Sequence, residues 1–136
     1  MTGSKATHLQ RYIIQRKHLK DVLKPADYRY LSFQIWQEGM AKYTEYKFLE
    51  LLATDSIPKV YNTLSDFIPY KELKEHFFRS EISNLTNLLL NKAHRVAFYS
   101  LGFAEGLLLD ELNKDWEKEY LEKKFFIENY ASQFSF

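Results

Sequence analysis

Apolar residues recur with a helical period along most of this chain, and residues that break helices are rare. Its 136 residues include only four glycines and three prolines. Apolar side chains spaced three and four residues apart form one face of an α-helix, which must be buried against other helices. We see no segment that a strand describes better. We therefore expect an all-α fold, a compact bundle of about five or six helices with no sheet, in a single domain spanning residues 1–136.

Prolines and polar residues place the helix boundaries. The first helix should end at Lys24-Pro25, because the residue before a proline is pushed out of the helical region. Asp27 should cap the next helix, and Asp115 should cap the last one. A short amphipathic piece is expected near residues 60–64. The main predicted helices span residues 6–23, 29–53, 70–90, 92–112 and 116–134.

Charge and cysteine content limit the partners and sites that the chain can have. The 19 Lys and Arg residues balance 18 Asp and Glu residues, so we expect no nucleic acid and no membrane surface as partner. Without cysteine there is no thiolate metal site, which leaves His, Asp and Glu as ligands. No apolar run reaches about 18 residues, and the N-terminus lacks a signal-peptide pattern. We expect a soluble protein without a targeting segment, of unknown localisation.

Three glycines occupy costly positions inside predicted helices. Glycine in a helix interior costs about 0.5–1 kcal/mol relative to alanine, so a small residue should be required there. Gly102 and Gly106 lie one turn apart, a spacing that lets another helix approach closely. Gly39 lies within an aromatic helix, where a metal or a tightly packed neighbour would explain it. We expect residues 29–53 and 92–112 to pack against each other at the centre of the bundle.

The residues around Gly39 resemble a motif of a known family. The octet reads Trp36-Gln37-Glu38-Gly39-Met40-Ala41-Lys42-Tyr43. It resembles the second helix motif of the gluzincin metallopeptidases, which carries Glu-Gly followed by Ala and Tyr and supplies the third zinc ligand. The resemblance implies that Glu38 is this ligand. It also implies that two histidines, spaced i, i+4 on an earlier helix, bind the same zinc and that the glutamate between them activates water.

The histidines of this chain depart from the family pattern. They are His8, His18, His76 and His94, no two are four residues apart, and the HExxH sequence is absent. Three explanations are open. The chain is the C-terminal part of a peptidase whose HExxH lies upstream, it is a relative that lost the metal, or the similarity is accidental. In the first case zinc is the cofactor, and this portion should be inactive alone. A simpler interpretation of Glu38 is an exposed ion pair with Lys42, worth about 0.3–0.5 kcal/mol.

The resemblance also implies roles for the central helix. Tyr99 or His94 would donate a hydrogen bond to the developing oxyanion, and Glu105 would orient a partner. The alternative is that His94 and Arg95 lie in water at the helix entrance, while Glu105 pairs with a lysine or tyrosine of a neighbouring helix.

Aromatic residues make up 17% of the chain, with 10 tyrosines and 11 phenylalanines. On the peptidase hypothesis, Tyr43, Tyr46 and Glu105 line the binding cleft. Dry packing is the alternative for the tyrosines, and we favour it because aromatic side chains are usually buried.

Two further clusters have plain structural interpretations. Asp110, Glu111 and Asp115 form an acidic cluster, but they lack the alternating loop carboxylates of a calcium site. The basic residues of the first helix are expected to form a solvated face; they are Arg11, Arg16, Lys17, Lys20 and Lys24.

The rival to a peptidase is a non-enzymatic helical module that binds a protein or a ligand. The expected partners are a peptide substrate or another protein, and aromatic faces could support a homodimer.

Overall fold

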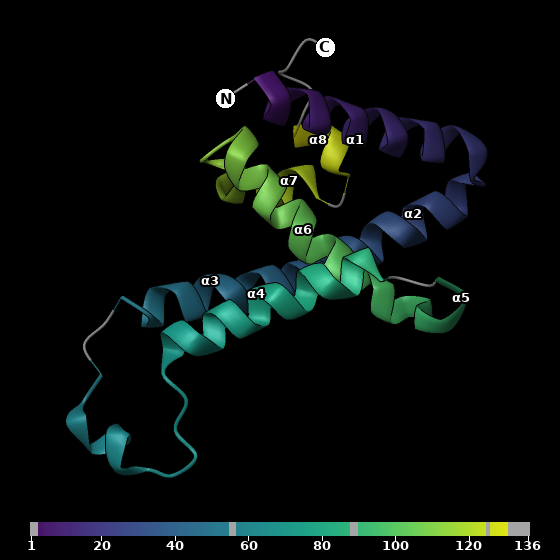
Figure 1. The fold of residues 1–136 in the computed structure, drawn as a ribbon. Coiled ribbons are helices and arrows are strands. Elements are labelled where there is room, and N and C mark those ends of the chain that lie inside the picture. Colours follow the sequence, from purple (N-terminus) through teal and green to yellow (C-terminus); the bar gives the residue numbers. More distant parts are fainter. Residues whose placement is uncertain (1–2, 55–56, 88–89, 125, 131–136) are drawn as a thin grey trace.

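The computed structural model describes residues 3–54, 57–87, 90–124 and 126–130, and over these ranges the chain is an all-α helical bundle without a strand (Figure 1). Five of its helices have seven or more residues, as the sequence predicts. The α-helices are α1 (Gly3–Val22), α2 (Pro25–Gln34), α3 (Met40–Leu52), α4 (Tyr70–Thr86), α5 (Leu90–Ala93), α6 (Ala97–Leu112), α7 (Tyr120–Lys123) and α8 (Ile127–Tyr130).

Proline separates the first two helices as predicted. Lys24 has extended backbone angles, φ −59° and ψ 144°, and Pro25 begins α2, where its missing amide proton costs nothing. Asp27 therefore lies within the first turn of α2, and the prediction that it caps this helix is wrong.

The stretch from Pro25 to Leu52 is helical throughout but changes its winding at the octet. Ile35–Gly39 form a π-helical turn, η1, between α2 and α3. A π turn inserts one extra residue and leaves backbone groups that other partners can reach. Here the Trp36 carbonyl accepts a hydrogen bond of 2.8 Å from the Tyr120 hydroxyl. The Tyr120 ring also stacks on Trp36, with 4.8 Å between ring centroids.

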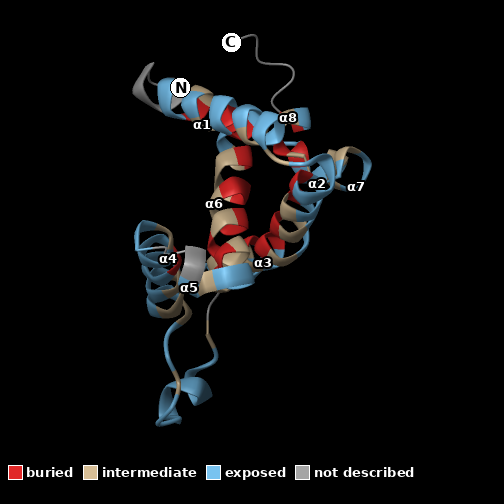
Figure 2. Cartoon of the chain, turned by 90° about the vertical axis from the view of Figure 1, so that its right-hand side faces the viewer, coloured by how far each residue is buried: buried red, intermediate tan, exposed pale blue. Residues whose placement is uncertain are grey.

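The glycines explain how α6 reaches the centre of the bundle. A Cβ atom on Gly39 would lie 2.3 Å from the Gly102 Cα, and one on Gly102 would lie 2.4 Å from the Gly39 Cα. A Cβ on Gly106 would meet the Tyr43 ring at 2.4 Å. Figure 2 shows buried residues concentrated along α6 and the facing part of α3. The predicted central packing of these two helical stretches is confirmed.

Helix α4 runs alongside α3, and the segment that joins them projects away from the helices (Figure 1). Within it, Lys59–Thr63 form a 3-10 turn, η2, at the predicted amphipathic piece. Val60 and Leu64 are exposed there, while Tyr61 stacks on Phe67 with 5.8 Å between centroids.

Two predicted helices are interrupted. The helix expected over 92–112 is regular only from Ala97, because His94 has a φ of 47° at the start of the 3-10 turn His94–Val96, η3. The helix expected over 116–134 is broken into the 3-10 turn Trp116–Glu119 (η4), α7 and α8. Lys124, with φ 53° and ψ −139°, ends α7. Residues 131–134 of that prediction lie outside the described residues.

The C-terminal segments complete the core against α1. Trp116, Ile127 and Tyr130 are buried in one cluster with Leu9 and Ile13 of α1. Asp115 precedes η4 without a side-chain cap hydrogen bond, so the predicted cap is wrong, and its carboxylate pairs with Lys118 at 2.7 Å. None of the helices in the described ranges is long and apolar enough to cross a membrane.

Candidate functional site

Glu38 lies in η1 beside the N-terminal end of α6. Its side chain is 17% exposed, and its Oε1 lies 3.2 Å from Nη2 of Arg95. Lys42 pairs instead with Glu45, with 2.9 Å between Nζ and Oε2. The simple prediction of an exposed ion pair with Lys42 is therefore wrong. Glu38 is held by a cation far away in the sequence.

The second carboxylate oxygen of Glu38 is unsatisfied. Oε2 is buried and has no hydrogen-bond partner among the residues that the structure describes. An unmade hydrogen bond of a buried atom costs about 1–3 kcal/mol, and one oxygen of Glu128 is in the same state. The Glu38 oxygen retains acceptor capacity for a donor group or a metal ion, which reaches it only when the side chains that cover it move.

Arg95 links Glu38 to Tyr99. The pKa of Arg95 is raised, first by its hydrogen bond with the Tyr99 side chain and then by the charge of Glu38. The adjacent His94 is exposed, as is Arg95, so the prediction that both lie in water at the helix entrance is confirmed. The structure thus gathers Glu38, Arg95 and Tyr99 at one point, with His94 next to them in the sequence.

Glu105 belongs to a different, buried network that joins α6 to α1. Its residue is 3% exposed, its Oε1 accepts a hydrogen bond from the Tyr12 hydroxyl, and the same oxygen lies 3.3 Å from Nε of Arg16. The expected tyrosine partner is confirmed. Arg16 is only 4% exposed and also donates to Ser32 Oγ at 3.1 Å, so the predicted solvated basic face is wrong at this residue.

Burial dominates the electrostatics of this network. It raises the pKa of the Glu105 carboxyl, although the charge of Arg16 and the Tyr12 hydrogen bond act in the opposite direction. Burial and the neighbouring Glu105 raise the pKa of the Tyr12 phenol well above its ordinary value. A carboxylate in such a position needs its partners, because an unpaired buried charge is very costly.

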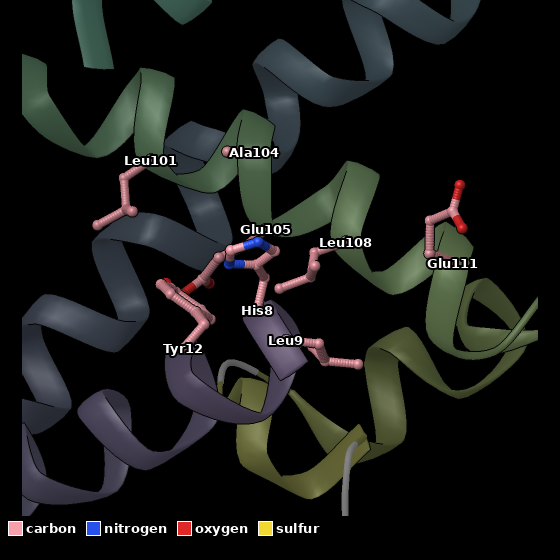
Figure 3. A pocket seen from close by; sticks show the side chains of 8 residues that line it. All are labelled: His8, Leu9, Tyr12, Leu101, Ala104, Glu105, Leu108 and Glu111. Carbon is pink, nitrogen blue, oxygen red and sulfur yellow. The ribbon is translucent and has the colours of Figure 1, made fainter. Parts of the chain in front are cut away.

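A pocket of about 410 Å³ lies between α1 and α6, and Tyr12 and Glu105 of this network line it. Figure 3 shows the α1 side chains His8, Leu9 and Tyr12 facing the α6 side chains Glu105 and Leu108. The eight lining residues are His8, Leu9, Tyr12, Leu101, Ala104, Glu105, Leu108 and Glu111.

Tyr43 takes part in a separate network at the other end of α6. Its hydroxyl donates to Asp110 Oδ1 at 2.6 Å, and the Trp116 indole donates to the same oxygen at 3.0 Å. Lys47 Nζ lies 3.5 Å from the other oxygen of Asp110. Asp110 therefore holds α3, α6 and η4 together, and Tyr43 lines a second pocket of about 480 Å³ with Glu117.

Tyr46 lies in a third environment. Its ring packs against Phe77, Phe78 and Phe103, with centroids 5.4 to 6.2 Å away. Tyr46 lines a third pocket, with Lys74. The sequence predicted one cleft lined by Tyr43, Tyr46 and Glu105, but each of these residues lines a different pocket. In the part of the chain that the structure describes, no three His, Asp or Glu side chains converge on a metal position.

Sequence reasoning did not find several of these partners. Tyr12 and Arg16 lie one turn apart on the face of α1 that carries Leu9 and Ile13, and this spacing was a usable signal. Glu81 gave none: it is 7% exposed in α4 and accepts a 2.5 Å hydrogen bond from Ser100 of α6, which only the tertiary fold reveals.

In comparisons with known proteins, no protein-family model, curated protein or solved structure matches the chain.

Proposed function

We propose that this chain is the helical C-terminal portion of a gluzincin-like zinc peptidase, with Glu38 as the carboxylate ligand. The supporting observation is the state of Glu38: it is mostly buried and its Oε2 has no partner among the described residues. A carboxylate on a rigid helical turn is a suitable zinc ligand because its direction is fixed before the metal binds.

The neighbours of Glu38 fit the same proposal. Zinc, when bound, would polarise a peptide carbonyl and activate water. Tyr99 would donate a hydrogen bond to the carbonyl oxygen of a peptide substrate, and exposed His94 would contact the substrate at the entrance. The Arg95 side chain is 66% exposed, so water can solvate its charge when a metal takes its place at Glu38. The two histidine ligands come from outside this chain, so this portion is inactive alone.

The proposal is tested by the reading frame upstream of Met1 and by zinc binding. An upstream HExxH is expected, and the longer protein should bind one zinc ion per chain. Glu38→Gln should weaken zinc binding at least about tenfold in a competition titration, because the carboxylate that contacts the metal is lost. The matched control is Glu45→Gln, which changes an exposed carboxylate paired with Lys42 and should leave affinity unchanged.

Two outcomes contradict the peptidase proposal. One is a native start at Met1 without an HExxH in the same protein. The other is unchanged zinc affinity in Glu38→Gln of the longer protein. Tight stoichiometric zinc binding by residues 1–136 alone would mean that other residues are the ligands.

The second proposal is a non-enzymatic module that binds another protein, or itself as a homodimer. Exposed apolar residues on α3 and the projecting segment favour it: Phe48 is 59% exposed and Val60 is 65% exposed. Sedimentation at rising protein concentration tests self-association. Phe48→Ser should weaken a dimer, whereas Leu121→Ser, at an exposed site on α7, should not. A monomer at all concentrations contradicts the homodimer.

A further inference from the structure

The pocket between α1 and α6 has the properties of a small-molecule site. Its volume of about 410 Å³ falls within the range of roughly 300–1,000 Å³ typical of ligand pockets. Its walls are aliphatic, formed by Leu9, Leu101, Ala104 and Leu108. Such pockets usually place a few polar groups against an apolar wall, and these groups orient the ligand. None of the lining residues belongs to the Glu38 site, so the inference does not depend on the proposed peptidase function.

Glu105 gives the pocket its polar end. The carboxylate is almost fully buried, and both of its contacts in the described residues, from Tyr12 and Arg16, use Oε1. A carboxylate can accept about four hydrogen bonds, so Oε2 retains acceptor capacity. A ligand that enters between the aliphatic walls therefore meets a hydrogen-bond acceptor.

Charge selects the head group of that ligand. Arg16 does not line the pocket, but its Nε pairs with Glu105 Oε1 while its Nη2 donates to Ser32. The pocket lining carries two carboxylates, Glu105 and Glu111, against this one guanidinium. A cation is therefore favoured over an anion, and an ammonium group, with three donors, suits an acceptor better than a hydroxyl does.

We propose that this pocket binds a primary amine with a short apolar body, whose ammonium group donates to Glu105 and whose body lies against Leu101, Ala104 and Leu108. The apolar body supplies most of the binding free energy through burial, and the ammonium group fixes the direction of entry.

Three probes of equal chain length test the head group. Hexylamine, hexanol and hexanoate are titrated into the protein at neutral pH by calorimetry. Hexylamine should bind at a single saturable site, at least about tenfold more tightly than the other two. Hexanol or hexanoate that binds as tightly as hexylamine would overturn the assignment, as would the lack of saturable hexylamine binding.

Replacing either of two alanines by phenylalanine tests where hexylamine binds. Ala104→Phe places a ring in this pocket and should weaken hexylamine binding at least about tenfold. Ala41→Phe is the matched control, because Ala41 lines the second pocket, with Tyr43, and hexylamine affinity should not change. Equal affinity in the native protein and a folded Ala104→Phe variant would contradict the site. Thermal unfolding of both variants checks that they fold.

Amide chemical shifts of the native protein give a second measurement that needs no variant. Hexylamine should shift the resonances of Leu101, Ala104 and Leu108. Shifts confined to Thr44 and Glu117, which line the second pocket, would overturn the proposal.

Discussion

At the scale of single residues, the glycine that follows Glu38 is explained by packing. Gly39 lies against the backbone of α6 at Gly102, and each of the two glycines has room only because the other also lacks a side chain. The sequence offered a metal or a packed neighbour as the reason for Gly39, and the structure supplies the neighbour. Gly39 therefore lends no independent support to a zinc site, and Glu38 must carry that proposal itself.

The sign of a stability change at Gly102 tests this contact. Helix propensity alone predicts that Gly102→Ala stabilises the protein by about 0.5–1 kcal/mol. A Cβ at 2.4 Å from the Gly39 Cα and 2.5 Å from the Ile35 carbonyl oxygen must instead force two helix backbones apart. We expect Gly102→Ala to lower the free energy of unfolding by at least about 2 kcal/mol in urea titration. A variant more stable than the native protein would show that α6 does not approach η1 this closely.

Glu105 makes a prediction about pH. Its pKa in the folded protein is raised above 4.5 by burial, so the folded state keeps a proton that the unfolded state releases. The stabilising contribution is fully present below the unfolded pKa and is lost as pH rises through the folded pKa. Glu105→Gln cannot titrate. The unfolding free energy of the native protein minus that of the Glu105→Gln variant should therefore fall as pH rises above 4.5, the ordinary pKa of a glutamate.

The native protein and Glu105→Gln are each unfolded in urea at a series of pH values. Glu45→Gln, at an exposed carboxylate, controls for the general effect of losing one acidic group. A difference that rises with pH would mean that attraction to Arg16 outweighs burial and that the pKa of Glu105 is lowered.

At the scale of elements, the break between α7 and α8 depends on one backbone conformation. Lys124 has φ 53° and ψ −139°, a combination that a residue with a Cβ atom adopts only under strain of about 1–3 kcal/mol. Its carbonyl accepts a 3.0 Å hydrogen bond from the hydroxyl of buried Tyr130, which helps to hold it there. Lys124→Gly should relieve the strain and stabilise the protein by about 1 kcal/mol in thermal or urea unfolding.

Glu122→Gly is the matched control for Lys124→Gly. Glu122 lies in the same short helix, and glycine there should destabilise by up to about 1 kcal/mol. If both substitutions destabilise equally, Lys124 is not strained in solution.

Helix positions were predictable where local chemistry determines them, and not where distant contacts do. Pro25 separates α1 from α2 by its own stereochemistry, and Gly102 and Gly106 marked the central crossing. The break at Lys124 had no local signal, because its sequence neighbours favour a helix while Tyr130 and the core select the bend. The Arg95 partner of Glu38 was equally hidden, since it depends on where α6 begins.

At the scale of the whole molecule, tyrosine hydroxyls join segments that are distant in the sequence. Tyr12 donates to Glu105, Tyr28 to Glu128 at 2.7 Å, and Tyr43 to Asp110. These bonds connect α1 and α3 to α6, and α2 to α8. The sequence left dry packing and a polar cleft as alternatives for the tyrosines. Here the rings pack in the interior while their hydroxyls donate to buried or partly buried carboxylates, so the tyrosines combine dry packing with polar contacts.

This arrangement predicts a loss of stability at alkaline pH. Burial raises the pKa of Tyr120 to about 12, and burial together with nearby carboxylates raises the pKa of Tyr28 and Tyr43 further. The folded state therefore keeps phenol protons that the unfolded state loses above pH 10, and stability present below that pH should decline as pH rises. The phenolate absorbance of the buried tyrosines and the helical circular dichroism should change together, because these phenols ionise on unfolding.

Tyr43→Phe tests the contribution of one such hydroxyl. At neutral pH it should destabilise the protein by about 1.5–3 kcal/mol, the value of a hydrogen bond to a charged group. This difference in stability between Tyr43→Phe and the native protein should shrink above pH 10. There the unfolded native chain releases the Tyr43 proton that the folded state keeps, which favours unfolding of the native protein. Tyr61→Phe, at an exposed ring in the projecting segment, should leave the free energy of unfolding at neutral pH unchanged. Phenolate absorbance that rises fully while the circular dichroism stays native would contradict the buried pairs, since their phenols would then ionise without unfolding the helices.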